Sequence, residues 1–290
     1  MSDLENYFVG IGTQRSGTTW LATQFDNHPD IGISPIKETH FWSSKFVDHQ
    51  RGSVRGFQAL KIRMRKLVRH CFLHPIEALR WISAYGGMMA HRESSYRKFV
   101  ELGRYGAAIA GEITPAYATL PKEGFAAIDH CREKPKYLFL LRNPAERFIS
   151  QIAHDSARGR CISRATSVQE LLADPAFALR SRYRDTYRIC QSVAGDDRLL
   201  VVFFEDLVDP RTGPASYERI CKYLGVRSHP VNLTTVINSF PTPNLSFSRD
   251  EIVEALRAEY VFFDQLYRGR LPVSWLEDTD NLRPKDFNIC

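Results

Sequence analysis

The chain has few cysteines and no long apolar run. Its six cysteines are scattered through 290 residues, and none of them belongs to a Cys-x-x-Cys pair. This spacing argues against a zinc site and predicts reduced thiols. No apolar segment approaches the ~20 residues that a membrane-spanning helix needs, and the polar, acidic N-terminus is unlike a signal peptide. We therefore expect a cytoplasmic protein without a transmembrane segment.

The composition is that of a globular protein. Charged residues make up 25% of the chain and hydrophobic residues 43%, which are ordinary fractions for such proteins. A chain of 290 residues is long enough for one domain with a sizeable core. No internal repeat and no linker-like segment divides it. The sequence therefore predicts a single domain over residues 1–290.

Positive charge is concentrated in one part of the chain. Residues 51–104 contain twelve Lys and Arg against three Glu, a net of +9, whereas the whole chain carries +6. Helical periodicity predicts a basic helical insert at about 45–106, broken by Pro75 and by Gly86-Gly87. Such a block favours an anionic partner, either an acidic acceptor or a membrane surface. A solvated helix face is the alternative, and no recognisable nucleic-acid-binding module surrounds the block, so no nucleic acid is expected.

Outside the insert, strand-like apolar runs alternate with helical segments. The clearest strand is Lys136–Arg142, which leads through Pro144 into a predicted helix that ends at Ser156. Further strands are expected at 7–12, 31–34, 107–114 and 198–204. The alternation predicts an α/β fold, with a central, mostly parallel sheet and helices on both faces. Helices are also expected at 179–193 and 210–224, followed by a loop-rich end with one helix near 250–260.

The first strand ends in a turn that predicts a phosphate site. Gly-Thr-Gln-Arg-Ser-Gly-Thr-Thr-Trp runs from Gly12 to Trp20, where helical spacing begins. A strand, tight turn and helix present backbone N–H groups and the positive end of a helix to an anion. Gly17 allows close approach of the backbone. A glycine turn that binds nothing is the alternative to this P-loop-like turn after strand 1.

A lysine is missing from this turn. Gly12-x4-Gly17 has the spacing of the nucleotide-triphosphate loop, in which a lysine follows the second glycine and reaches the β- and γ-phosphates. Thr18 stands at that position, and Arg15 places a cation inside the loop instead. The loop therefore suits a phosphate that is not part of a conventional triphosphate.

A second phosphate-binding pattern follows the clearest strand. Arg142 ends the strand, and Ser150 lies eight residues later, two turns along the next helix. The guanidinium fork suits a phosphate, and a serine hydroxyl can complete its shell. The alternative is an ordinary strand-to-helix turn in which Arg142 only caps its neighbours.

These segments resemble the sulfotransferases that use 3′-phosphoadenosine 5′-phosphosulfate (PAPS). The run from Arg15 to Thr19 is similar to that family's 5′-phosphosulfate loop, and the run from Arg142 to Ser150 to its 3′-phosphate motif, Arg-x-Pro-x-x-Arg-x-x-Ser. Three more stretches resemble the carbohydrate-type and bacterial branch, namely Lys37-Glu-Thr-His-Phe-Trp42, Gly111-Glu-Ile-Thr-Pro-Ala-Tyr117 and Phe204-Glu-Asp-Leu207. The resemblance covers about 7–44 and 107–225, but neither the insert nor the chain after 230.

The resemblance implies transfer of a sulfuryl group from PAPS to a hydroxyl or amine of a saccharide, lipid or small natural product. Arg15 would stabilise the departing phosphate. Glu38 would be the catalytic base, with its pKa tuned upward by burial, and His40 is the alternative base. No metal would be needed, because the donor carries no triphosphate. The residues implied to contact PAPS are Arg15, Ser16, Gly17, Thr18, Thr19, Trp20, Arg142 and Ser150.

Several points stay open at this stage. Trp20 would either stack on adenine or belong to the core, and Glu112 would either orient Arg15 or Lys37 or be a buried, paired carboxylate. Ile113 and Ser43 stand where the family often has Lys and Asp, so the resemblance does not assign the acceptor. No clear match to the family's late Arg-x-Gly segment is found, and the oligomeric state is not predicted.

Two other function classes compete with this one. A kinase-like phosphoryl transferase is disfavoured by the missing loop lysine and by the pair formed by Arg142 and Ser150. A non-catalytic nucleotide-binding protein is disfavoured by Glu38 beside His40.

Overall fold

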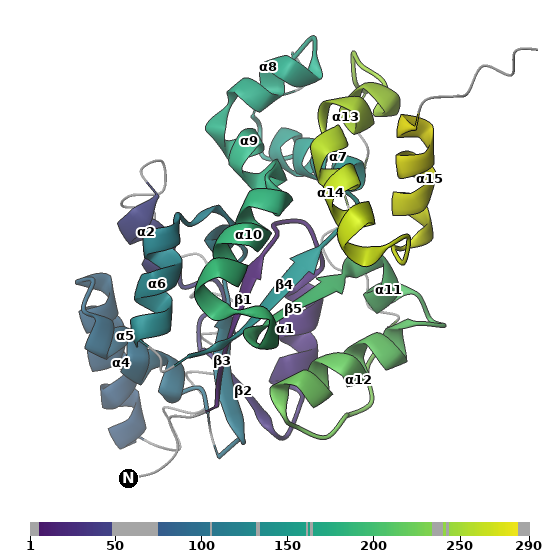
Figure 1. The fold of residues 1–290 in the computed structure, drawn as a ribbon. Helices are drawn as coiled ribbons and strands as arrows, with labels where there is room; N and C mark the ends of the chain where they lie inside the picture. Colours follow the sequence, from purple (N-terminus) through teal and green to yellow (C-terminus); the bar gives the residue numbers. More distant parts are fainter. Residues whose placement is uncertain are drawn as a thin grey trace, which may run out of the picture.

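The computed structural model describes residues 6–47, 75–104, 106–131, 134–160, 162, 165–233, 240–241 and 244–283. Most of the basic charge predicted for the insert falls on residues 48–74, which lie outside the described residues. The described chain is built around a five-stranded parallel sheet with the strand order β2-β3-β1-β4-β5 (Figure 1).

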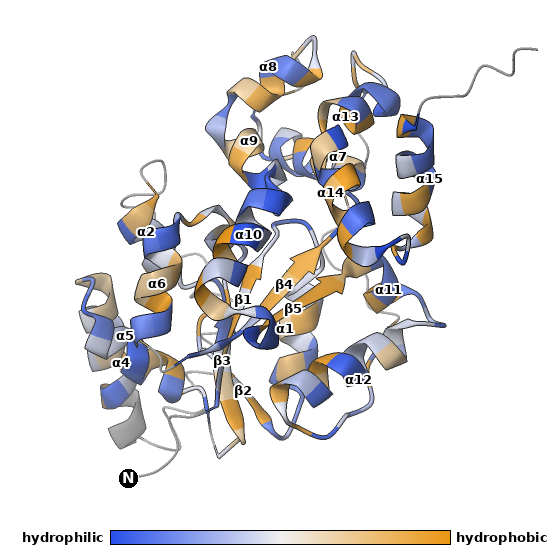
Figure 2. Ribbon diagram, viewed as in Figure 1, coloured by the Kyte–Doolittle hydropathy of each residue, from blue (hydrophilic) through white to orange (hydrophobic). Residues whose placement is uncertain are grey.

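All five strands fall where the sequence predicts them, and the predicted α/β fold is confirmed. They span Tyr7–Gly12 (β1), Ile31–Ile33 (β2), Ile109–Ile113 (β3), Lys136–Leu141 (β4) and Leu199–Phe203 (β5). In β1 every residue is buried, because helices cover both faces of the sheet. β4 and β5 cross the centre of the fold as hydrophobic strands (Figure 2).

Two layers of helices cover the sheet. α1 (Thr18–Asp26) and α12 (Gly213–Leu224) pack on the face that carries Phe8. The opposite face, which carries Val9, is covered by α2 (Phe41–Phe46), η2 (Pro115–Thr119), α6 (Lys122–Cys131) and α10 (Tyr183–Ala194) among others. The remaining helices are α4 (Pro75–Met89), α5 (Glu93–Glu101), α7 (Pro144–Ser156), α8 (Val168–Ala173), α9 (Pro175–Ser181), η4 (Asp196–Arg198), α11 (Phe204–Val208), α13 (Arg249–Ala255), α14 (Arg257–Tyr267) and α15 (Val273–Leu282).

The predicted helix break at Gly86-Gly87 is wrong, because α4 continues through both glycines. A Cβ on Gly87 would lie 2.1 Å from Oγ of Ser95, in α5. Glycine at this position therefore lets the two helices approach closely, and the chain turns only after Met89. Likewise, the helix predicted over 179–193 is two helices, α9 and α10, which meet at Arg182.

The loop-rich C-terminal quarter predicted from its prolines is also wrong. Three helices, α13, α14 and α15, occupy most of it, and they lie beside α7 (Figure 1). Ser248 and Glu251 form a capping box that begins α13. Tyr260 and Trp275 are fully buried, so these helices share the main core.

The strand order reverses direction at one point of the sheet. From β1 the chain moves outward to β2, returns to β3, and then crosses β1 to reach β4. In such open sheets, ligands bind outside the carboxyl ends of the strands where the order reverses. Here that point lies between the ends of β1 and β4, which carry the two predicted phosphate motifs.

Candidate active site

The turn between β1 and α1 has the features of an anion-binding loop. Arg15 and Gly17 have φ angles of 71° and 77°, and helix α1 begins directly afterwards at Thr18. The first N–H groups of a helix have no partner within the helix, so they are available to an anion. Ser16 is buried, and its Oγ lies 2.5 Å from Oγ1 of Thr13.

Gly17 is required by its surroundings. A Cβ at this position would lie 2.5 Å from Cδ2 of Phe204, which follows strand β5. Its left-handed backbone also favours glycine. An aromatic ring thus packs against the loop backbone at Gly17, and close approach of an anion to that backbone stays a prediction.

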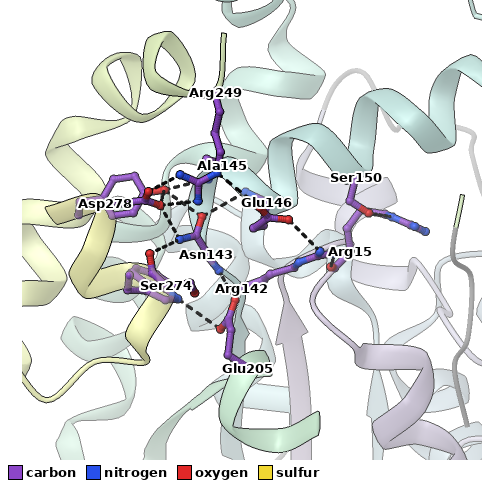
Figure 3. A network of polar contacts seen from close by, with 12 residues as sticks. Arg15, Arg142, Asn143, Ala145, Glu146, Ser150, Glu205, Arg249, Ser274 and Asp278 are labelled. Carbon is purple, nitrogen blue, oxygen red and sulfur yellow. Dashed lines mark hydrogen bonds and ion pairs between the residues drawn. The ribbon is translucent and has the colours of Figure 1, made fainter. Parts of the chain in front are cut away.

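The two predicted phosphate motifs meet in space. Nε of Arg15 donates to Oγ of Ser150 at 3.0 Å, and Nη1 of Arg142 lies 3.5 Å from the carbonyl oxygen of Arg15 (Figure 3). Burial, together with the nearby positive charge of Arg142, lowers the pKa of Arg15. Two guanidinium groups near enough to repel each other, beside the N-terminus of α1, form a site whose charge favours an anion.

Aromatic rings support both guanidinium groups. The Arg142 group lies 5.2 Å from the ring centre of Phe204, and the Arg15 group 5.3 Å from that of Phe240. Such cation–π contacts hold the planar groups in place without occupying their N–H donors.

The turn that carries Arg142 is fixed by a buried polar network (Figure 3). Asn143 caps α7 by accepting from the N–H of Glu146 at 3.1 Å, and Pro144 occupies the predicted first helical position. The Asn143 side chain donates to Oδ2 of Asp278 at 2.7 Å, and its N–H donates to Oε1 of Glu205 at 2.7 Å. The β4–α7 turn is therefore held by α11, which carries Glu205, and by α15, which carries Asp278.

The network continues to Arg142 through charged groups. Arg249 forms a bidentate ion pair with Asp278, in which Nη2 lies 2.8 Å from Oδ2. Glu146 lies between two arginines, with its oxygens 3.5 Å from Nε of Arg249 and 3.4 Å from Nη2 of Arg142. Sequence reasoning missed these residues, since Arg249 and Asp278 lie more than 100 positions after Arg142 in the sequence. Only the capping role of Asn143, directly before a helix-starting proline, had a local signal.

The third segment, which follows β2, reaches the loop through Lys37. Its Nζ donates to Oγ1 of Thr19 at 3.0 Å and to Oε1 of Glu38 at 2.5 Å. Nε2 of His40 lies 3.7 Å from the other oxygen of Glu38. The side chains of Glu38 and His40 are thus adjacent, and the Lys37 side chain bridges the Glu38 carboxylate to Thr19 at the start of α1.

The upward tuning of Glu38 expected from the sequence is not found. Burial alone would raise the pKa of Glu38, but Lys37 and His40 outweigh burial and lower that pKa to about 2. The carboxylate is therefore ionised at neutral pH, and it accepts hydrogen bonds without first losing a proton.

The structure places Trp20 and Glu112 in the core. Trp20 is 4% exposed, packs edge-to-face on Tyr217 and donates to the carbonyl oxygen of Asn232 at 3.0 Å. These contacts are those of the core alternative, and stacking on adenine stays a prediction. Glu112 is fully buried and accepts hydrogen bonds from four hydroxyl groups, so it is the paired, buried carboxylate of the two alternatives.

The arrangement gathers positive charge beside an ionised carboxylate. Positive charge comes from the loop amides and from the side chains of Arg15, Arg142 and Lys37. The Lys37 side chain lies between the Glu38 carboxylate and the loop. Within the ranges that the structure describes, no group of three or more His, Cys, Asp or Glu could hold a metal ion. The same ranges contain no helix that is long and apolar enough to cross a membrane.

Comparisons with known proteins identify the fold and the family. The model of the sulfotransferase family matches residues 8–230. A sulfotransferase from Alicyclobacillus acidocaldarius is similar with a TM-score of 0.64 and 20% identity, over 95% of this chain and 99% of that one. The sulfotransferase domain of the Synechococcus PCC 7002 olefin synthase has a TM-score of 0.52 and 19% identity, over 96% and 92%.

A third solved structure, the sulfotransferase domain from the curacin biosynthetic pathway, has a TM-score of 0.53 and 14% identity, over 96% of this chain and 95% of that one. Identities this low show a shared fold, and the family match rests on residues 8–230. No curated protein matches the chain.

Proposed function

The chain belongs to the sulfotransferase family, and we propose that it transfers a sulfuryl group from PAPS to a hydroxyl or amine of an acceptor, leaving 3′-phosphoadenosine 5′-phosphate (PAP). The observation that carries the proposal is the meeting of Arg15, Arg142 and Ser150 at the carboxyl ends of β1 and β4. The 3′- and 5′-phosphates of one ribose are close neighbours, so a site for both needs two motifs that touch.

In this proposal the loop from Arg15 to Thr19 holds the 5′-phosphosulfate, and Arg142 with Ser150 holds the 3′-phosphate. In the structure the Ser150 hydroxyl accepts from Arg15. An incoming phosphate would offer both guanidinium groups a charged acceptor, and charge-assisted hydrogen bonds of this kind are about twice as strong as neutral ones.

The transfer is an in-line displacement. The acceptor oxygen or nitrogen forms a bond to sulfur while the bond from sulfur to the phosphate oxygen breaks, and the electron pair stays on the departing phosphate. Arg15 and the loop amides stabilise that growing charge. Glu38 takes the acceptor's proton, and the movement of Lys37 from Glu38 toward the donor would raise the basicity of Glu38.

The acceptor is proposed only as a class. Two of the similar structures come from an olefin synthase and from the curacin pathway, which fits a small or lipid-like acceptor as well as a saccharide. The basic insert adds a preference for an anionic acceptor. The proposed location is the cytoplasm, in keeping with the free thiols of Cys131, Cys190 and Cys221.

Calorimetry with PAP and with ATP in the presence of magnesium tests this reaction class. We expect tight binding of PAP and weak binding of ATP that magnesium does not improve, because the loop lacks the lysine that reaches a triphosphate. Tight, magnesium-dependent ATP binding would support a phosphoryl transferase instead. Tight PAP binding without turnover on any acceptor would support a non-catalytic nucleotide-binding protein.

Arg142→Ala is expected to weaken PAP binding at least tenfold more than binding of the same nucleotide without its 3′-phosphate. The contact to the extra phosphate is a charged hydrogen bond, and hydrogen bonds to charged groups contribute about 1.5–3 kcal/mol. Ser150→Ala should act in the same direction but less, because Ser150 also contacts Arg15. Calorimetry with both nucleotides measures the difference, and an equal loss for both would make these residues structural.

A further inference from the structure

Glu112 occupies a position where an apolar side chain is expected. It lies in β3, on the sheet face that packs against Tyr96 and Tyr117, and it is 0% exposed. A buried carboxylate is costly unless hydrogen bonds satisfy its oxygens. Here four hydroxyl groups do so. Oε2 accepts from Thr39 at 2.6 Å and from Thr114 at 2.9 Å, while Oε1 accepts from Tyr117 at 3.0 Å and from Tyr96.

The two phenols remain donors. Burial, assisted by the negative charge of Glu112, raises the pKa values of Tyr96 and Tyr117. Both therefore stay protonated at neutral pH and direct their O–H groups at the carboxylate. The Glu112 carboxyl group is thus enclosed by hydroxyl groups that donate to it.

Thr39 connects this cluster to the active site. It stands between Glu38 and His40, whose φ angles are 60° and 54°. Non-glycine residues in this left-handed region are strained and persist only where their surroundings fix them. Thr39 supplies the fixing contacts, because its N–H donates to Thr114 at 3.1 Å and its hydroxyl donates to Glu112.

We propose that Glu112 is a positioning residue, which acts through the Thr39 hydroxyl to hold Glu38 and His40 in their left-handed conformations beside Lys37. The inference rests on the proposed function, because it assigns Glu112 to the alignment of the proposed base. Glu112 touches no substrate in this assignment. Instead, Glu112 aligns the carboxylate of Glu38, which contacts the acceptor in the proposed reaction.

A matched pair of variants at Thr39 tests the proposal. Thr39→Val keeps the shape of the side chain and removes the hydroxyl, whereas Thr39→Ser keeps the hydroxyl. We expect Thr39→Val to lower kcat about 10²-fold, which is the cost of misplacing a catalytic group by about 1 Å, and Thr39→Ser to restore most of it. PAP affinity should be nearly unchanged in both variants, because Thr39 lies outside the proposed phosphate motifs. Wild-type kcat in a folded Thr39→Val variant would overturn the proposal.

Coupling to Glu38 separates positioning from a general structural role. If Glu112 acts only through the base, Thr39→Val and Glu112→Gln should reduce kcat much less in a Glu38→Gln background than in the wild type. Equal reductions in both backgrounds would contradict the proposal. If Glu112→Gln does not fold, the comparison of Thr39→Val with Thr39→Ser in the two backgrounds provides the same test.

A measurement that does not depend on turnover distinguishes a failure of this proposal from a failure of the proposed function. ¹³C NMR of the Glu38 carboxyl, assigned with Glu38→Gln, should show no protonation between pH 7 and 3.5 in the wild type. In Thr39→Val the carboxyl should titrate toward its ordinary pKa of about 4.5, because its contacts with Lys37 and His40 are loosened. An unchanged titration would overturn the positioning role. Absent PAP binding in the wild type would instead overturn the proposed function alone.

Discussion

Replacing Glu38 by Gln is expected to lower sulfuryl transfer by about 10²–10⁴-fold, the usual contribution of a general base. The amide cannot take the acceptor's proton, yet it has nearly the shape of the carboxylate it replaces. PAP affinity should survive, because the phosphate contacts come from Arg15, Arg142 and the loop amides. Initial rates with labelled PAPS, together with PAP calorimetry, measure both effects.

His40→Asn is the control that decides between the two candidate bases. His40 lies 3.7 Å from Glu38, so it can support the carboxylate without itself taking the proton. We expect measurable transfer to remain in this variant. If His40→Asn abolished transfer and Glu38→Gln retained it, the role of base would pass to His40.

Arg15→Ala is expected to lower kcat by about 10²–10³-fold while it changes the dissociation constant of PAPS much less. The guanidinium group meets charge that grows on the departing phosphate in the transition state, and a preorganised donor of this kind contributes about 2.7–4 kcal/mol. Its carbonyl contact with Arg142 belongs to the backbone and persists in the variant. Steady-state and single-turnover kinetics separate the two parameters.

Two further variants serve as comparisons for Arg15→Ala. Arg15→Lys keeps the charge but loses the fork, so it should fall between Arg15→Ala and the wild type. Arg283→Ala, which removes a 63% exposed side chain that pairs with Asp264 and Asp280, should leave kcat unchanged. A variant of Arg15 that lost PAPS binding but kept full turnover at saturation would contradict the assigned role.

The sheet and the turn between β1 and α1 were predictable because their signals are local. Each strand is a short apolar run bounded by polar or turn residues, and Pro144 marks the start of α7 directly. Distant contacts explain what was missed. Gly87 looks like a helix breaker until the side chain of Ser95 in the neighbouring helix is placed against it. The C-terminal prolines suggest loops, although Pro272 only caps α15.

In the candidate site, too, some features could be predicted from local sequence and others could not. Arg15, Arg142 and Glu38 stand in segments whose spacing can be read along the chain. The downward shift of the Glu38 pKa could not be predicted, because it depends on where Lys37 and His40 point. Nor could the role of Glu112, whose four hydroxyl partners come from four separate positions between 39 and 117.

The ion pair between Arg249 and Asp278 is relevant to which fragments of this chain would keep the candidate site intact. The family match ends at residue 230, and all the recognisable motifs lie before that point. Yet Asn143, which follows Arg142, donates to Asp278, and Trp275 belongs to the main core. The limit of sequence similarity is therefore not the limit of the cooperative folding unit. A fragment cut at residue 230 would contain every motif and lack the helices that hold one of them in place.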